Sequence, residues 1–163
     1  LNYHMIRKAK VSDAKAIALI YNHFVLNSTF TFEEKKVDYK TIIDRIGINK
    51  KHKWWVYEKN HIIMGYAYST QWKTRSAYRY TAESSVYVTQ KYQKKGIGKA
   101  LFNHLVKSLK DDGFRRILAG ISLPNNKSVI FHEKLGFKKV GQLEKVGFKF
   151  KKWIDVGYWE LEI

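Results

Sequence analysis

Two parts of this chain carry residue types that can bind an anion and transfer a proton. The loop Gln93-Lys94-Lys95-Gly96-Ile97-Gly98 places lysines and glycines directly before a long amphipathic segment. Glu83 lies on the stretch that precedes this loop, and His132 lies on a later one. The chain has no cysteine, which excludes a thiolate nucleophile and leaves hydroxyls, imidazoles, carboxylates, amines and backbone amides for chemistry.

The loop from Gln93 to Gly98 has the composition of an anion-binding turn. A helix N-terminus leaves several backbone N–H groups without intrahelical partners, and its dipole is positive at that end. Gly96 and Gly98 have no side chain that would block a phosphate group, and the neighbouring lysines add positive charge. The pattern lacks the residues of Walker A and the third glycine of the Rossmann fingerprint. A simple tight turn is the alternative interpretation.

Glu83 and His132 are the titratable groups with the clearest chemical use. A carboxylate can accept the proton of an ammonium group, and partial burial raises its pKa toward the working range. The alternative for Glu83 is an ion pair with Arg75 or Arg79. An imidazole can relay a proton, but a histidine on a helix is more often packed or solvated.

The elements that position these groups alternate between helices and strands. The residue patterns predict strands over 3–8, 54–58, 62–71, 80–88, 116–121, 138–142 and 153–161. They predict helices over 14–26, 39–48, 95–110 and 126–135. Ser12 and Asp13 are expected to cap the first helix, and Gly136 to end the last. This order indicates a mixed α/β fold.

Apolar spacing predicts which helix faces are buried. In the helix over 95–110, leucines and an isoleucine recur at intervals of four residues: Ile97, Leu101, Leu105 and Leu109. The first helix is expected to bury Ile17, Leu19, Ile20 and Phe24. The second is expected to bury Ile42, Ile43 and Ile46.

Length, composition and charge set the broad class. The 163 residues fit one domain, 1–163, without a linker or repeat, and a 45% hydrophobic content excludes a disordered chain. The formal net charge of +17 favours a polyanionic partner, with a lysine-rich solvated surface as the alternative. No signal peptide or membrane span is apparent, so we expect a cytoplasmic protein without membrane contact. Leu1 to His4 precede Met5, and one interpretation is that they are not native.

Several motifs in the right order resemble the GNAT N-acetyltransferase superfamily. Gln93-x-x-Gly96-x-Gly98 after a strand resembles its acetyl-CoA signature, and the segment 125–137, which ends in Gly-Phe, resembles its second hallmark. The segments 73–88, 123–125 and 147–157 resemble the branch that acts on phosphinothricin, methionine sulfoximine and methionine sulfone. The resemblance covers nearly the whole chain and implies a central, mostly antiparallel mixed sheet flanked by helices.

The resemblance implies an acetyl-CoA-dependent N-acetyltransferase that uses direct attack in a ternary complex. Glu83 then corresponds to the general base, and His132 to a residue that relays a proton or donates to the leaving sulfur. The implied cofactor contacts are Val86, Tyr87, Val88, Gln93, Lys94, Lys95, Gly96, Ile97, Gly98, Lys99, Asn125 and Ser128. Asn125 and Ser128 are also ordinary helix-capping residues. No metal is implied.

The same resemblance implies an acceptor site for a small amino-acid-like amine. The implied acceptor contacts are Lys73, Arg75, Tyr78, Tyr87 and Phe30, with the loop 27–32 over the acceptor. Lys73 and Arg75 suit an acidic group, although a solvated loop is the alternative, and strand tyrosines are usually core.

The resemblance also implies a homodimer with the acceptor site near the interface. Acetylation of another amine, such as a protein N-terminus, stays open as an alternative. A non-catalytic domain that binds CoA or nucleic acid is a further alternative, but no nucleic-acid-binding signature supports it.

Overall fold

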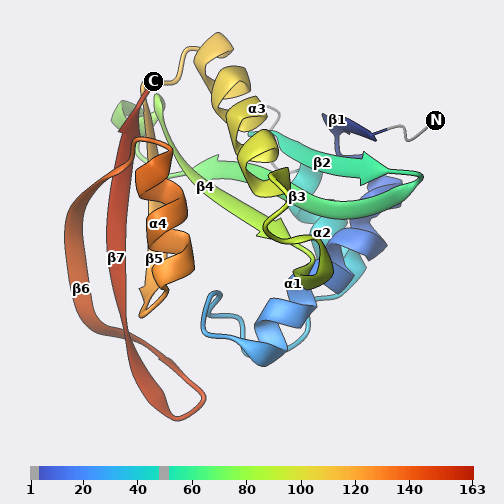
Figure 1. The fold of residues 1–163 in the computed structure, drawn as a ribbon. Coiled ribbons are helices and arrows are strands. Elements are labelled where there is room, and N and C mark those ends of the chain that lie inside the picture. Colours follow the sequence, from blue (N-terminus) through green and yellow to red (C-terminus); the bar gives the residue numbers. More distant parts are fainter. Residues whose placement is uncertain (1–3, 48–51) are drawn as a thin grey trace.

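The computed structural model describes residues 4–47 and 52–163 (Figure 1). The strands of these residues are β1 His4–Lys8, β2 Trp54–Lys59, β3 Ile62–Gln71, β4 Thr81–Val88, β5 Arg116–Leu123, β6 Lys138–Lys149 and β7 Lys152–Glu162. The α-helices are α1 Ala14–Asn27, α2 Tyr39–Gly47, α3 Ile97–Asp111 and α4 Asn126–Lys134. Short 3-10 turns are η1 Val11–Asp13, η2 Ser76–Tyr78 and η3 Gln90–Tyr92. The predicted ends at Tyr3 and Ile48 lie outside the described residues.

All the described strands form one sheet in the order β1-β2-β3-β4-β5-β7-β6. Every neighbouring pair is antiparallel except β4 and β5, which run parallel. The prediction of a mixed, mostly antiparallel sheet is therefore confirmed. The parallel pair is the place where the chain must cross over, and α3 makes that connection between β4 and β5.

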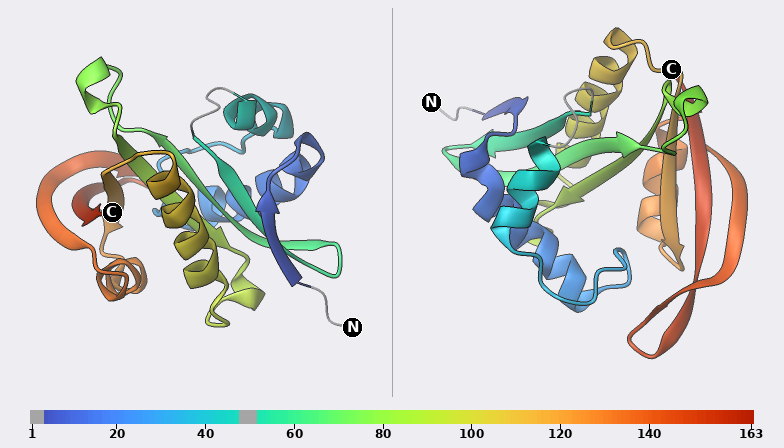
Figure 2. Two further views of the ribbon diagram at one scale, coloured as in Figure 1. Left: turned by 90° about the horizontal axis from the view of Figure 1, so that it is seen from above. Right: turned by 180° about the vertical axis from the view of Figure 1, so that it is seen from behind.

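The helices cover both faces of the sheet (Figure 2). Helix α3 packs on β2, β3 and β4, and its buried residues join Phe114, Phe137 and Trp159 in one core cluster. Helices α1 and α2 pack together on the opposite face, in a second cluster that includes Trp54 and Tyr66. Since β4 contributes residues to both clusters, it lies between the two cores.

The helix faces follow the apolar spacing, with one exception. Ile17 and Ile20 of α1 are buried as predicted, but Leu19 is 76% exposed, so its assignment to the buried face was wrong. Leu19 is one residue from Ile20 in sequence, and neighbouring helical positions point about 100° apart. The predicted cap was also wrong in mechanism. Asp13 holds the N-cap position, but its carboxylate accepts hydrogen bonds from Arg7 and from the backbone N–H of Lys10.

The C-terminal hairpin is longer than its sequence pattern indicated. Strand β6 runs to Lys149 rather than to Gln142, and it pairs with β7 to form a long arm that extends beyond α4 (Figure 1). Its pairing shifts register between Lys139 and Gly141 and again between Leu143 and Gly147. These irregularities break the two-residue alternation from which a strand is recognised, which is why the prediction stopped early.

Candidate functional site

Strand β4 leaves its parallel neighbour at Glu83. It pairs with β3 from Ala82 to Val88, whereas its pairing with β5 covers only Thr81 to Glu83. Beyond Glu83 the two strands diverge, as the ribbon shows (Figure 1). The edge of β4 that faces β5 is therefore unpaired with β5 over residues 84–88.

The backbone of Val86 and Val88 faces this gap. The N–H of Thr89 donates to the carbonyl of Met64 on β3 at 2.9 Å. Because successive residues direct their N–H and C=O groups to opposite sides of a strand, Val86 and Val88 direct theirs away from β3. One of these groups already has a partner, because the Gln93 side-chain amide donates a hydrogen bond to the Val88 carbonyl at 3.2 Å. The geometry agrees with the predicted cofactor role of this strand, and it gives Gln93 a role in holding the loop.

The loop between β4 and α3 has the backbone form of an anion-binding turn. Lys94 and Gly96 both adopt left-handed conformations, with φ of 61° and 79°. Helix α3 begins at Ile97, two residues later than predicted, because these residues are not helical. Gly96 is needed for its backbone, whereas a Cβ on Gly98 would meet Phe131 at 3.5 Å, an ordinary contact.

The side chains of this loop divide into two groups. Lys94, Lys95 and Lys99 are exposed, so they add positive charge at the open N-terminus of α3. The Ile97 side chain is 5% exposed and packs in the core, so only its backbone can contact a cofactor. The structure therefore brings together backbone N–H groups, a helix dipole and a rim of ammonium groups.

Glu83 lies half-buried at the point where β4 and β5 separate. Burial raises the pKa of its carboxyl group, and the nearby Lys73 ammonium partly opposes that rise. Among the ion pairs of residues 4–47 and 52–163, none joins Glu83 to Arg75 or Arg79, the alternative considered from the sequence. A carboxylate with a raised pKa and no close ion pair suits proton transfer near neutral pH.

His132 lies on α4 within an aromatic cluster. It is 9% exposed, and Phe102, Phe131 and Phe137 pack against its ring. Its Nδ1 lies 2.8 Å from the carbonyl of Ser128, which assigns the ring proton to Nδ1. Burial lowers the pKa of His132, so the imidazole is neutral near pH 7 and its Nε2 is an acceptor. This state suits proton acceptance better than donation to a leaving sulfur.

Asn125 and Ser128 shape the start of α4. Asn125 is its N-cap, and its side-chain oxygen accepts a hydrogen bond from the Ser128 N–H at 3.2 Å. The capping role considered from the sequence is therefore present, and it does not conflict with cofactor contact. The Ser128 hydroxyl also lies 3.3 Å from His132 Nδ1.

The segment between β3 and β4 is exposed. Lys73 and Arg75 are both exposed, and Tyr78 in η2 is 40% exposed. Lys73 lies over the Trp72 ring, 4.9 Å from its centroid, and close enough to Glu83 to affect its pKa. The structure thus places Lys73 near the candidate base, while the predicted acceptor contacts of Arg75 and Tyr78 stay predictions.

Tyr87 and Phe30 occupy the α1 side of the sheet. The Tyr87 ring packs on Tyr21, Phe24 and Tyr66, with centroid distances of 5.4, 5.2 and 5.4 Å. Its side chain is therefore part of the second core cluster, as strand tyrosines usually are. Phe30 is 44% exposed on the loop after α1.

The loop after α1 is held by the β6–β7 hairpin. The Lys149 ammonium, in a side chain that is 1% exposed, donates to the Thr31 carbonyl at 2.8 Å. The Tyr21 hydroxyl lies 2.6 Å from the Thr31 hydroxyl, and Gly147 packs so tightly on the Phe32 ring that a Cβ would not fit. Segments far apart in sequence thus fix the loop expected to cover the acceptor.

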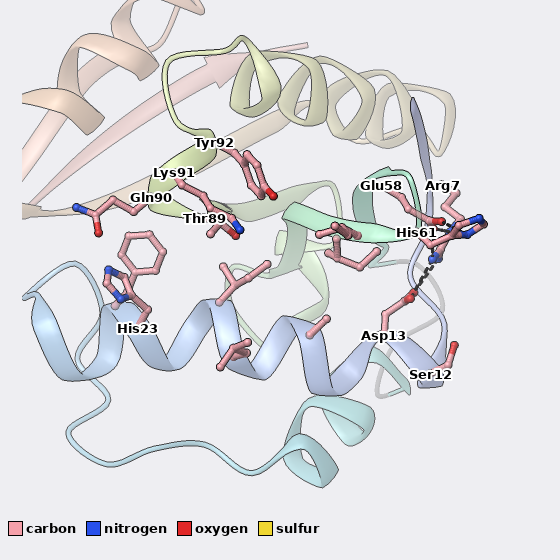
Figure 3. Close-up of a pocket in the computed structure, with 16 residues that line it drawn as sticks. Arg7, Ser12, Asp13, His23, Glu58, His61, Thr89, Gln90, Lys91 and Tyr92 are labelled. Atoms are coloured by element: carbon pink, nitrogen blue, oxygen red, sulfur yellow. Dashed lines mark hydrogen bonds and ion pairs between the residues drawn. The ribbon is translucent and has the colours of Figure 1, made fainter. Parts of the chain in front are cut away.

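A groove of about 880 Å³ lies between α1, the turn that joins β2 and β3, and η3, and Glu83 is not among its lining residues (Figure 3). Arg7 closes one end through ion pairs with Asp13 and Glu58, and Leu19 is among its apolar lining residues. The turn η3 forms part of its wall, so the groove reaches the segment that leads into the loop before α3. None of the residues predicted for catalysis lines it.

The sequence interpretation missed three residues near Glu83 and the loop after α1. A Cβ on Gly120 would lie 3.2 Å from Glu83 Oε1 and 3.4 Å from the Tyr158 ring, and Lys149 anchors the loop after α1. A glycine inside an apolar strand is a signal of close approach that could have identified Gly120. Tyr158 and Lys149 carry no such signal, because only the pairing of β5, β6 and β7 brings them to the site.

Residues 4–47 and 52–163 contain neither a candidate metal site nor a candidate membrane-spanning helix. No group of three or more His, Asp or Glu side chains in these ranges is arranged to hold a metal ion. No helix in them has the length and apolar character to cross a bilayer.

Comparison with known proteins places this arrangement in a family context. Residues 6–157 match the acetyltransferase (GNAT) domain. A phosphinothricin N-acetyltransferase of Streptomyces viridochromogenes is 39% identical over 95% of this chain and 85% of that enzyme. An L-methionine sulfoximine/L-methionine sulfone acetyltransferase of Salmonella typhimurium is 33% identical over 97% of this chain and 94% of the relative. The crystal structure of a Sinorhizobium meliloti phosphinothricin acetyltransferase in complex with acetyl-CoA superposes on this chain with a TM-score of 0.93. The two chains are 31% identical, and the match covers 98% of this chain and 88% of that one.

Proposed function

The chain belongs to the GNAT acetyltransferase family, and we propose that its acceptor is the primary amine of a small amino-acid analogue. It is an N-acetyltransferase that uses acetyl-CoA. The acceptor class proposed is that of phosphinothricin, methionine sulfoximine and methionine sulfone, on which the relatives named above act. The half-buried Glu83 at the opening of the β4–β5 gap is the observation that carries the proposal.

The open edge of β4 and the loop before α3 fit acetyl-CoA. This co-substrate supplies the acetyl group as a thioester. Val86 and Val88 direct backbone groups into the β4–β5 gap toward its amide-containing arm, in the manner of an added strand, and the Val88 carbonyl already accepts a hydrogen bond from Gln93. The N–H groups at the start of α3 and the ammonium groups of Lys94 and Lys95 would hold its phosphates.

Glu83 is proposed as the general base. The acceptor reaches the protein as an ammonium, which must lose a proton before its nitrogen can attack. The Glu83 carboxylate accepts that proton, directly or through one water, and becomes a neutral carboxyl group. Burial favours the neutral form, so the raised pKa assists this step.

His132 is proposed as a second proton-handling residue of the site. Its neutral ring keeps a proton on Nδ1, held by the Ser128 carbonyl, and presents Nε2 as an acceptor. The aromatic cluster around it excludes water and fixes the ring. Lys73 and Arg75 are proposed to receive the acidic end of the acceptor, since both are cationic and Lys73 lies near Glu83.

We further propose that the enzyme acts in the cytoplasm as a homodimer. Strand β6 is an edge strand, and the hairpin carries large exposed apolar side chains: Val140, Leu143, Val146, Phe148, Phe150 and Trp153. Such a row on an edge is a surface that a second copy can cover. Because the hairpin also holds the loop over the acceptor, a dimer through this face would border the acceptor site. Sedimentation at increasing salt tests it, and a monomer at micromolar concentration would contradict it.

A thiol-release assay with acetyl-CoA tests the acceptor class. The panel contains phosphinothricin, methionine sulfoximine, methionine sulfone, common amino acids, a polyamine and a short peptide with a free N-terminus. We expect turnover to be fastest with the amino-acid analogues. The field of a chain with a net charge of +17 opposes the polyamine. Turnover only with the peptide would replace the proposed acceptor by a protein N-terminus, and no turnover with any amine would refute the proposed acceptor class.

A further inference from the structure

Gly120 lies inside β5 at a position where its backbone has no need of glycine. It lies among the paired residues of β5 and β7, opposite Tyr158, and it is not among the residues with positive φ. Glycine in such a position weakens a strand, so its presence indicates a close approach. A Cβ at Gly120 would lie 3.2 Å from Glu83 Oε1 and 3.4 Å from Tyr158 Cε1. The Glu83 and Tyr158 side chains therefore border the space that a side chain at position 120 would fill.

Tyr158 belongs to a group of side chains near Glu83. The Trp72 ring meets the Tyr158 ring edge-on at a centroid distance of 5.4 Å, and the Lys73 ammonium lies over Trp72. Burial and the Glu83 carboxylate both raise the pKa of Tyr158, so its hydroxyl is protonated near neutral pH. Glu83 thus has a neutral hydroxyl-bearing ring on one side and Lys73 nearby.

Ser122 supplies an independent sign that a ligand enters here. It lies two residues after Gly120 on β5, so both positions belong to the same face of the strand. Ser122 is 7% exposed, and its hydroxyl has no hydrogen-bond partner within the described part of the chain. A buried hydroxyl without a partner costs stability unless a bound molecule supplies one.

We propose that Gly120 and Tyr158 are specificity-determining residues of the acceptor pocket. The acceptor amine lies over the Cα of Gly120, between the Glu83 carboxylate and the Tyr158 ring, with the Tyr158 and Ser122 hydroxyls available to polar groups of the acceptor. This inference rests on the proposed function, with Glu83 as the base. Any side chain at position 120 would occupy the space of the amine and push the carboxylate out of line.

Gly120→Ala, Gly120→Val and Tyr158→Phe test the inference. We expect Gly120→Ala to lower kcat by about tenfold and Gly120→Val by about 100-fold, the scale of misplacing a reacting group by about 1 Å. Tyr158→Phe is expected to raise the acceptor KM about fivefold, the scale of one neutral hydrogen bond. The Kd for acetyl-CoA should stay unchanged in all three. Gly47→Ala is the matched control, because a Cβ there meets nothing within 4 Å.

A pH profile separates this role from a merely structural one. The titratable groups that face Glu83 are Lys73, Tyr68 and Tyr158, and Gly120→Ala leaves all of them in place. A methyl group against the carboxylate displaces water, so the acid limb of kcat/KM should move to higher pH. Wild-type kcat and an unmoved acid limb in Gly120→Ala would overturn the inference while the proposed function stands. Absence of turnover by the wild-type enzyme with every amine would overturn both.

Discussion

Replacement of Glu83 by glutamine is the most informative single perturbation of this enzyme. Glutamine has nearly the same shape, so the packing beside Gly120 is retained while the ability to accept a proton is lost. A positioned general base contributes about 10²- to 10⁴-fold to rate, or roughly 3–5 kcal/mol of barrier. We expect kcat to fall by that factor and the Kd for acetyl-CoA to change less than about twofold, since Glu83 lies at the opposite end of β4 from the anion-binding loop.

Although Glu83→Gln should lower kcat, it should not lower the free energy of unfolding at pH 7. Burial raises the pKa of Glu83, so the native state keeps this proton to a higher pH than the unfolded chain does. The free energy of unfolding therefore falls as pH rises above the ordinary carboxyl range and through the raised pKa. Glutamine cannot ionise, so Glu83→Gln should be at least as stable as the wild type at pH 7 and lack this decline.

On the same preparations, thiol release gives kcat and KM, titration with acetyl-CoA gives its Kd, and thermal unfolding gives the stability. Glu144→Gln, an exposed glutamate on β6, is the control for loss of one negative charge. The acid limb of the wild-type kcat/KM profile should lie above the ordinary carboxyl pKa and vanish in Glu83→Gln. Equal kcat for the variant and the wild type would refute the assignment of Glu83 as base.

Other predictions concern the loop, the histidine and the hairpin. Gly96→Ala should lower stability by about 1 kcal/mol or more, because its φ of 79° is left-handed, whereas Gly98→Ala should leave stability unchanged or raise it by up to about 1 kcal/mol. If the cofactor approaches Gly98 closely, calorimetry will nevertheless show weaker acetyl-CoA binding for Gly98→Ala; unchanged binding would assign that glycine to packing alone. His132→Phe should keep the fold within its aromatic cluster but lower kcat by about 10²-fold, and a variant with full activity would leave His132 a structural role only. Because burial lowers the pKa of His132, its native state loses stability as pH falls below the ordinary histidine range, and the phenylalanine variant should lack that loss in acid unfolding. Lys149→Met should raise the acceptor KM about tenfold by releasing Thr31, with acetyl-CoA binding unchanged; equal KM values would show that the hairpin does not hold the acceptor loop.

The mixed α/β order and the main elements were predictable from local pattern. Helix α3 was recognised because Ile97, Leu101 and Leu105 repeat at the helical period, and all are buried. The strands predicted over 54–58 and 62–71 left three residues between them, and there Asn60 and His61 adopt positive φ. Patterns of this kind depend on neighbours in sequence, so they survive without knowledge of the tertiary fold.

Errors arose where specific side-chain contacts or strand irregularities override the expected local pattern. Asp13 was expected to cap α1, but its carboxylate instead accepts hydrogen bonds from the Arg7 side chain and from the Lys10 backbone N–H. The strand ending at Gln142 was cut short because register shifts hide the rest of β6. Family motifs, not periodicity, singled out Glu83 and His132, because a charged residue on a strand has the same local signature whether it is a base or part of an ion pair.

The sequence by itself indicated a glycine-containing turn, rimmed by lysines, at the start of a helix near residues 93–98, since glycines, lysines and helical spacing are local properties. Only the tertiary structure decided that β4 parts from β5 after Glu83, because strand pairing depends on residues more than 30 positions apart in sequence. The pairing of β5 with β4 and β7 brought Gly120 beside the carboxylate and placed Tyr158 opposite Gly120. The gap, the half-buried carboxylate and the open surface over Gly120 are consequences of how strands meet, and no stretch of sequence contains them.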